Sequence, residues 1–389
     1  MITRRLVWAL GVSQLTLWGI SYYMIAVFGE PIARETGWSR TAVYGGFSAA
    51  LVAMGLLSSR IGRMIDVDGG RRVMTLGSLL AAAGCLLIAA SSHLSVYYLG
   101  WLVLGVAMRM SLYDAAFASL ARIGGPEARR PISQITLLGG LASTVLWPVG
   151  QILIEHCGWR WALVAYAGLA LATVPLHLMI SRGRYAHGGG RRGSIAAPRA
   201  DTPRRIALAG FLYSAMVTLT SALNSAMSAH MIAILTSLGL AAGVAVGIGT
   251  LRGIGQSASR GAEILFGRRL DPIALGLLAT AIVPVGFVIG LWSGVSAWAG
   301  VVFALLYGAG NGLVTIIRGT QPLVLFDPAS YGQVVGRLIG PSFLVSALAP
   351  ALLAFLIERH GAASALYIST AVAVLVLGSS VWLWLAFRR

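Results

Sequence analysis

The chain has 389 residues, of which 57% are hydrophobic and only 11% charged, a composition far from that of a soluble enzyme. Its formal net charge of +17 comes from arginine alone, because the sequence contains no lysine. These arginines lie in short segments between apolar runs of about 20 residues, the length that a helix needs to cross a bilayer. We therefore expect a lipid bilayer as partner and no nucleic acid, which basic faces of a polar domain would indicate. Two cysteines provide neither a disulfide framework nor a metal site.

Twelve apolar segments of helical length follow one another along the chain. Because every backbone polar group in lipid must be paired within its own segment, each is predicted to be a helix rather than a lone strand. The first follows Arg4 and Arg5 and is expected to be an uncleaved span rather than a signal peptide. The predicted spans are residues 6–28, 41–59, 73–91, 95–120, 131–155, 159–180, 206–236, 241–266, 272–292, 297–317, 331–357 and 362–387. The fold class is therefore an all-α integral membrane protein with twelve transmembrane helices.

The loops between the spans differ in their arginine content. Arginines gather in every second loop, as in 60–72 and 122–130, whereas the intervening loops hold few. The positive-inside rule then places both termini in the cytoplasm, for a multi-pass protein of the cell inner membrane. Residues 182–205 are basic and rich in glycine, and we expect a flexible cytoplasmic linker there. It separates an N-terminal six-helix bundle, residues 1–181, from a C-terminal one, residues 206–389.

A charged, glycine-rich stretch follows the second span and has a shorter echo after the eighth. The first reads Gly62-Arg63-Met64-Ile65-Asp66-Val67-Asp68-Gly69-Gly70-Arg71-Arg72, and the echo reads Gly267-Arg268-Arg269-Leu270-Asp271. Two more pairs of segments match at corresponding places, 153–158 with 356–361 and 30–36 with 230–236. Three matches in one register indicate that the chain is a duplication of a six-helix half.

The first charged stretch resembles the loop signature of the major facilitator superfamily. Val67 departs from it, since the family usually has Arg or Lys there. The resemblance implies two pseudo-symmetric six-helix bundles and a secondary transporter that works by alternating access. It also implies that the loop braces the cytoplasmic helix ends during the conformational switch, with Asp66 facing helix N-termini and nearby arginines. The residues of this predicted switch loop are Gly62, Asp66, Gly69, Arg71, Arg72, Gly267 and Asp271.

Within the superfamily, two features are similar to particular branches. Gly37-Trp38-Ser39 before the second span and an arginine inside the eighth resemble the monocarboxylate and oxalate/formate porters. The fifth span reads Trp147-Pro148-Val149-Gly150 and lacks the Gly-Pro-rich signature of the drug/proton antiporters. The resemblance therefore favours an organic anion as substrate.

Polar and aromatic residues at helical spacing inside the spans are the candidate substrate-binding residues, because lipid is a costly environment for them. Arg109 and Arg252 lie one in each half, and arginine stays charged where water is scarce. A substrate carboxylate would bind such a guanidinium through two hydrogen bonds. The alternative is a structural arginine paired with Asp114, Glu263 or backbone carbonyls. The predicted binding residues are Arg109, Arg252, Gln256, Tyr113, Asn224, Asn311, Trp18, Tyr22 and Trp147.

Three titratable residues are candidates for proton coupling: Glu30, His230 and Asp114. Glu30 and His230 occupy matching places in the two halves, and histidine titrates near neutrality. The alternatives are a surface carboxylate for Glu30 and a hydrogen-bonded packing histidine for His230. Arg260 and Glu263, near the cytoplasmic end of the eighth span, are expected to form a structural or gating ion pair.

Together these patterns predict a monomeric, proton-coupled transporter of a small organic anion, with no cofactor, no metal and no enzymatic activity. A second hypothesis keeps the fold but exports neutral or cationic toxic compounds. A third hypothesis is a transporter-like membrane sensor.

Overall fold

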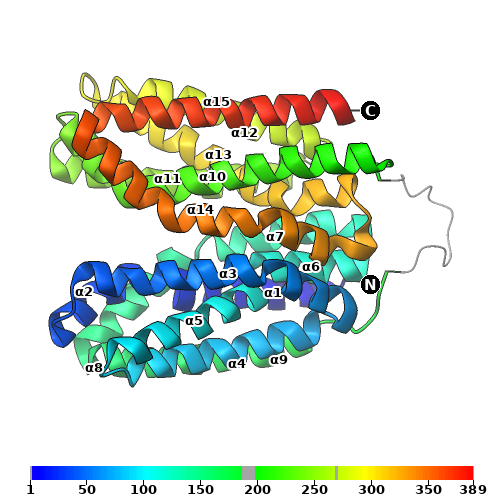
Figure 1. The fold of residues 1–389 in the computed structure, drawn as a ribbon, viewed down its shortest axis with the longest axis horizontal. Coiled ribbons are helices and arrows are strands. Elements are labelled where there is room, and N and C mark those ends of the chain that lie inside the picture. The colour runs from blue at the N-terminus through cyan, green and yellow to red at the C-terminus, as the bar shows by residue number, and fades with distance from the viewer. Residues whose placement is uncertain (1, 186–197, 268–269, 389) are drawn as a thin grey trace. The chain divides into compact units, whose positions relative to one another are not determined.

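The computed structural model describes residues 2–185, 198–267 and 270–388, and all regular structure in these residues is helical (Figure 1). The predicted linker falls partly on 186–197, outside the described residues, as do Arg268 and Arg269. The helices of the first half are α1 (Arg4–Leu17), π-helix η1 (Trp18–Tyr22), α2 (Ile25–Thr36), α3 (Arg40–Asp68), α4 (Gly70–Ala89), α5 (Leu94–Ser111), α6 (Tyr113–Gly124), 3-10 helix η2 (Gly125–Ala128), α7 (Arg129–Gly139), α8 (Ala142–Ala172) and α9 (Val174–Leu178). Those of the second half are α10 (Pro203–Ser237), α11 (Ala242–Phe266), α12 (Pro272–Gly290), α13 (Ala297–Leu325), 3-10 helix η4 (Pro328–Ser330), α14 (Tyr331–His360) and α15 (Ala362–Phe387).

The chain divides into two compact units. The first comprises Met1–Ala196 together with Asp327–Gly340, and the second comprises Ala197–Phe326 together with Pro341–Arg389. Helix α14 thus contributes its first ten residues to unit 1 and its remainder to unit 2. The predicted domain boundaries and the arrangement of two six-helix bundles stay predictions.

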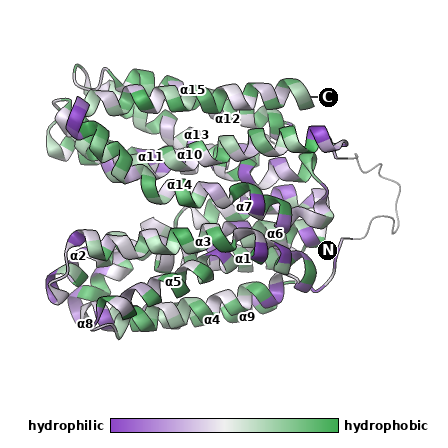
Figure 2. Cartoon of the chain, in the orientation of Figure 1, coloured by the Kyte–Doolittle hydropathy of each residue, from purple (hydrophilic) through white to green (hydrophobic). Residues whose placement is uncertain are grey.

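Within the described ranges, nine helical segments are long and apolar enough to cross a membrane. One of them, Leu94–Leu178, contains all the helices from α5 to α9. Helix α11 is not among the nine, because polar residues such as Arg252 and Gln256 lower its hydropathy. The predicted number of twelve spans therefore stays a prediction. Figure 2 shows most helical surface as hydrophobic, with the hydrophilic segments gathered mainly toward helix ends.

Several helices extend beyond the apolar segments that predicted them. The second span was expected to end at residue 59, but α3 continues to Asp68, so most of the charged stretch is helix and not a loop. A single residue, Gly69, separates α3 from α4, and its φ of 86° and ψ of 152° lie in a region that only glycine adopts readily. Similarly, α13 continues to Leu325, past the predicted end at 317. Hydropathy marks the part of a helix that suits lipid, whereas caps and glycines decide where the helix ends.

Two of the predicted continuous spans are interrupted. The fourth breaks at Leu112, whose extended backbone separates α5 from α6. The fifth breaks between α7 and α8. Within α8, Gly158 has φ 77° and separates two helical stretches, at the place where the fifth and sixth spans were predicted to be separate. The first span also contains the π-helical turn η1, a type of irregularity that is frequent at functional sites.

Prolines inside α13 and α14 leave two carbonyl groups without a helical donor, and two side chains of α10 donate to them instead. Proline has no N–H, so the carbonyl four residues before it loses its helical donor. For Pro322 this is the carbonyl of Arg318, which accepts a hydrogen bond of 2.6 Å from the Tyr213 hydroxyl. Ser225 likewise donates to the Ser346 carbonyl, four residues before Pro350, at 2.7 Å. In unit 2, α10 therefore stabilises two helices at their weakened turns.

Glycines allow the helices of unit 2 to approach until their backbones touch. A Cβ on Gly255 of α11 would overlap the Leu305 carbonyl oxygen of α13, and one on Gly308 would overlap the Arg252 carbonyl oxygen. Small residues at such positions are how helices pack in lipid, where no hydrophobic force drives them together.

A run of three glycines spaced by four residues, Gly332, Gly336 and Gly340, serves the same purpose in unit 1. A Cβ on Gly332 or on Gly336 would overlap the Gly62 or the Ser58 carbonyl oxygen of α3, respectively. This Gly-x-x-x-Gly-x-x-x-Gly pattern is a sequence signal for close helix packing that our sequence analysis missed.

We predict that Gly255→Ala destabilises the protein by about 1–3 kcal/mol, because the new methyl group must push α11 away from α13. Gly253→Ala is the matched control, since a Cβ there meets nothing within 4 Å. Gly253→Ala is expected to be neutral or slightly stabilising, as alanine suits a helix better than glycine. Thermal unfolding of the two purified variants in detergent gives the comparison, and equal melting temperatures would contradict the packing argument.

Candidate functional site

Arg252 is the centre of a polar cluster contributed by three helices of unit 2. Its Nη2 donates a hydrogen bond of 2.6 Å to Oδ1 of Asn224, on α10. Its guanidinium carbon also lies 5.3 Å from the ring centroid of Tyr307, on α13, which is cation–π distance. The Tyr307 hydroxyl in turn donates to the carbonyl of Leu223, the residue before Asn224, at 3.1 Å. Tyr307 is buried, so the ring and the amide are held in place around the guanidinium.

Both asparagines of the chain, Asn224 and Asn311, belong to this region. Asn311 follows Tyr307 by one helical turn in α13 and is 5% exposed. Its Nδ2 has no hydrogen-bond partner among the residues that the structure describes. The neighbouring residue Gly312 packs against the backbone carbonyl of Gln256, another predicted binding residue. Four of the predicted residues, Arg252, Gln256, Asn224 and Asn311, are therefore brought together along the contacts among α10, α11 and α13.

The charge of Arg252 is not balanced by a carboxylate. None of the ion pairs among the described residues involves Arg252. Its partners are an amide dipole and an aromatic ring, and neither carries a negative charge. A charged side chain within a membrane helix costs at least ~2.5–3.5 kcal/mol, and these two partners offset that cost only through a dipole and a ring quadrupole.

Arg109 has a different environment in unit 1. It is 2% exposed, and it donates from Nε to the Ser58 hydroxyl at 2.9 Å and from Nη2 to the Ser58 carbonyl at 3.1 Å. Its guanidinium also lies against Gly336, at the start of α14. These contacts correspond to the structural alternative, an arginine that binds backbone, and they give its predicted role in substrate binding no support. That role stays a prediction.

The predicted aromatic binding residues of unit 1 form one cluster around η1. The ring centroid of Trp18 lies 4.9 Å from that of Tyr22 and 4.9 Å from that of Tyr113. Trp147, which is 41% exposed, donates from Nε1 to the Tyr23 carbonyl at 3.1 Å. Aromatic rings grouped in this way provide a rigid surface for an apolar or planar ligand body.

The break in the fourth span supports this cluster. At the break, the Ser111 carbonyl accepts a hydrogen bond of 2.8 Å from Nε2 of buried Gln14. Gln14 Oε1 and Trp18 Nε1 are buried without hydrogen-bond partners. The carbonyl freed at the break therefore holds the side chain of Gln14, one helical turn before Trp18.

The predicted coupling residues occupy three separate places. Glu30 is partly exposed and pairs with Arg40 at 2.7 Å, as expected of the surface alternative. His230 forms a hydrogen bond of 2.9 Å with the Pro350 carbonyl, and Nε2 is the donor because a carbonyl oxygen can only accept. Asp114 lies in the first turn of α6, partly buried. The coupling role of each stays a prediction.

Asp66 belongs to the last turn of α3, and its carboxylate lies at the N-terminus of α14. Its Oδ1 accepts from the Gly332 N–H at 2.8 Å, and its Oδ2 accepts from the Gln333 N–H at 2.7 Å. A carboxylate that caps exposed backbone donors is favoured there by both hydrogen bonding and the helix dipole. Arg122 of α6 donates from Nε to the Asp66 carbonyl at 3.1 Å. The switching role of this stretch stays a prediction.

The remaining switch-loop residues take several positions. Gly62 contacts Gly332, Gly69 breaks the helix, and Arg71 and Arg72 lie in the first turn of α4. In the second half, Gly267 follows α11, and Asp271 caps α12 and forms an ion pair with Arg199.

The predicted gating residues Arg260 and Glu263 are both buried, and Arg260 donates to Thr315 Oγ1 of α13 at 3.1 Å. A gating role for the pair stays a prediction.

Comparison with protein families gives a match over most of the chain. The family model described as Major Facilitator Superfamily matches residues 11–338. The chain belongs to the major facilitator superfamily. It is accordingly a multi-pass membrane transporter of a small molecule, and no catalytic activity is indicated.

Individual members of the superfamily are more distant. Monocarboxylate transporter 3 of Mus musculus is 34% identical over 153 residues, which are 38% of this chain and 30% of that protein. An MFS-type efflux pump of Mycolicibacterium smegmatis is 30% identical over 185 residues, 46% of this chain and 42% of that protein. The chain thus matches less than half the length of either relative. The solved proton:xylose symporter XylE has the same fold, with a TM-score of 0.75, 11% identity and coverage of 98% of this chain and 94% of that one.

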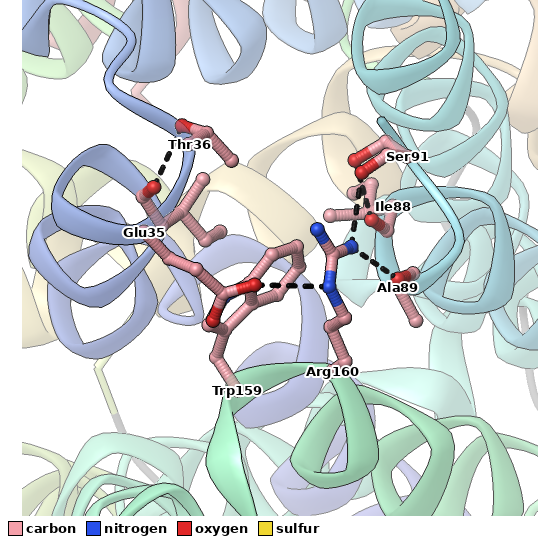
Figure 3. Close-up of polar contacts among 8 residues, drawn as sticks. Glu35, Thr36, Ile88, Ala89, Ser91, Trp159 and Arg160 are labelled. Carbon is pink, nitrogen blue, oxygen red and sulfur yellow. Dashed lines mark hydrogen bonds and ion pairs between the residues drawn. The ribbon is translucent and has the colours of Figure 1, made fainter. Parts of the chain in front are cut away.

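One polar cluster of this superfamily member escaped the sequence analysis. Arg160, just after the Gly158 kink, donates to Glu35 at 3.1 Å and to the carbonyls of Ala89 and Ser91 at 2.8 and 2.9 Å (Figure 3). Trp159 donates from Nε1 to the same Glu35 carboxylate at 2.7 Å. The guanidinium therefore caps the C-terminal end of α4 and ties it to α2 and α8. Its signal in the sequence was an arginine in a loop otherwise poor in arginine.

We predict that Arg160→Ala destabilises unit 1 by about 1–3 kcal/mol, because carbonyls at the end of α4 and the Glu35 carboxylate lose a charged donor. Arg160→Lys is expected to retain only part of the stability, since an ammonium cannot reproduce the planar fork of a guanidinium. Arg34→Ala, an exposed arginine of α2, is the matched control. The argument is wrong if Arg160→Ala and Arg34→Ala unfold at the same temperature.

Proposed function

We propose that this transporter moves a small organic anion with a carboxylate-like head by alternating access, together with a proton, in the cell inner membrane. The observation that supports it is the guanidinium of Arg252, which has an amide and an aromatic ring as partners and no carboxylate. A substrate carboxylate would supply the missing charge and two acceptor oxygens.

Two further features agree with an anionic substrate. Asn311 Nδ2 is a buried donor without an acceptor, and a carboxylate has acceptor capacity beyond what one arginine uses. The similarity to a monocarboxylate transporter points to the same substrate class.

Substitution of Arg252 tests the proposal directly. Purified protein in liposomes is assayed for uptake of radiolabelled acetate, lactate, pyruvate and benzoate. Arg252→Ala is expected to lower uptake at least about tenfold, as a charge-assisted hydrogen bond contributes about 1.5–3 kcal/mol. Arg109→Ala measures the other predicted arginine in the same assay. Uptake by Arg252→Ala at the wild-type rate, or no uptake of any of these acids by the wild type, would refute the proposal.

Proton coupling has its own test. An inward-directed proton gradient is expected to drive accumulation of the transported acid in wild-type liposomes, and an uncoupler should abolish it. His230→Gln or Glu30→Gln is expected to lose this accumulation while retaining exchange of labelled for unlabelled acid, because exchange needs no net proton release. Glu155→Gln, at an exposed carboxylate, is the control. Gradient-driven accumulation by both variants at the wild-type level would exclude these two residues as the coupling site.

Export of neutral or cationic toxic compounds is the second candidate function, and the similarity to an MFS-type efflux pump favours it. It differs in its dependence on charge, because a neutral or cationic compound gains nothing from a guanidinium. Resistance to such compounds on expression, unaffected by Arg252→Ala, would support export.

A further inference from the structure

We propose that Asn224 is an internal substitute for the substrate carboxylate and that its neutral amide determines how readily the anion site fills and empties. This inference rests on the proposed function, since it concerns the same site. Asn224 Oδ1 occupies a donor of Arg252 at 2.6 Å, which a carboxylate oxygen would otherwise take.

The geometry fixes which end of the amide faces Arg252. A guanidinium has only donors, so the atom opposite Nη2 must be the carboxamide oxygen and not the nitrogen. The backbone next to Asn224 is held as well, because the Leu223 carbonyl accepts from the Tyr307 hydroxyl. The amide oxygen is therefore presented to the guanidinium.

An amide suits this task because it is a weaker acceptor than a carboxylate. It satisfies a donor of Arg252 in the absence of substrate, and a carboxylate can displace it because charged acceptors form stronger hydrogen bonds. An aspartate at the same position would neutralise Arg252 permanently, since buried ion pairs are costly to break. An alanine would leave the guanidinium without this competitor.

The two substitutions are therefore expected to change the apparent affinity for the anion in opposite directions. Asn224→Ala is expected to lower the KM for lactate or benzoate by about 3- to 10-fold, the effect of removing one competing hydrogen bond. The maximal rate should fall in the same variant, because tighter binding slows release. Asn224→Asp is expected to reduce uptake of both acids at least about tenfold, as the new carboxylate occupies the guanidinium.

Ser228→Asp is the matched control for added charge. It lies one turn beyond Asn224 on α10 and is exposed, so it adds the same charge one turn away from the side chain that bonds Arg252. Its uptake should remain closer to that of the wild type than the uptake of Asn224→Asp. Thermal unfolding of all variants separates loss of function from loss of folded protein.

The outcomes distinguish this inference from the proposed function. If Arg252→Ala leaves uptake unchanged, the anion site itself is wrong. If Arg252→Ala abolishes uptake but Asn224→Ala raises the KM or leaves it unchanged, Asn224 is only a structural partner of Arg252 and the inference is wrong. If Asn224→Asp and Ser228→Asp reduce uptake equally, the effect of Asn224→Asp is general electrostatics and the inference is likewise overturned.

Discussion

A guanidinium inside an apolar helix must find partners without water, and this constraint organises both units. Arg109 meets it with the hydroxyl and carbonyl of one serine on a neighbouring helix, where it is almost completely buried. Arg252 meets it with an amide oxygen and the face of a tyrosine ring. The ion pairs among the described residues give Arg252 no carboxylate. The difference lies in what surrounds them: Arg109 binds backbone at a glycine-packed helix contact, whereas Arg252 lies among residues with donors to spare, as Asn311 shows.

The same absence of water explains why backbone groups freed by irregular turns find side-chain partners. Pro322 and Pro350 each leave a carbonyl without its helical donor, and hydroxyls on α10 replace that donor. At the break before Tyr113, the Ser111 carbonyl accepts a hydrogen bond from the Gln14 side chain. Such substitutions cost little, so helices in lipid can contain bends and breaks that the isolated segment would not tolerate. The irregular turns at η1 and Leu112 are also where aromatic residues gather, which places adaptable backbone next to the cluster around Trp18.

The sequence predicted helices and membrane insertion well because both depend on local composition. Apolar runs of bilayer length identify most described helices. Arg252, Gln256 and Asn311, selected for their helical spacing, lie on α11 and α13, two helices that pack together. Helix ends were predicted poorly, as at Asp68 and Leu325, because apolar length does not determine where hydrogen bonding stops. Contacts between helices were missed because sequence periodicity carries no signal for them. Examples are the contact of Arg109 with Ser58, the capping of α4 by Arg160 and the position of Tyr307 beside Arg252. The glycines at 332, 336 and 340 did carry a readable pattern, and it would have predicted the contact with α3.

The two copies of the charged motif show how a duplicated sequence acquires different chemistry. Asp66 and Asp271 occupy corresponding places, yet Asp66 accepts from two backbone N–H groups of α14, whereas Asp271 caps its own helix and binds Arg199. A carboxylate at a helix terminus can use either kind of donor, so the local surroundings decide. Backbone donors hold Asp66 without requiring a particular side chain, and an ion pair makes Asp271 depend on one arginine beside the linker. Sequence symmetry in such a chain therefore locates the positions at which charge resides, and only the three-dimensional partners show how each charge is held.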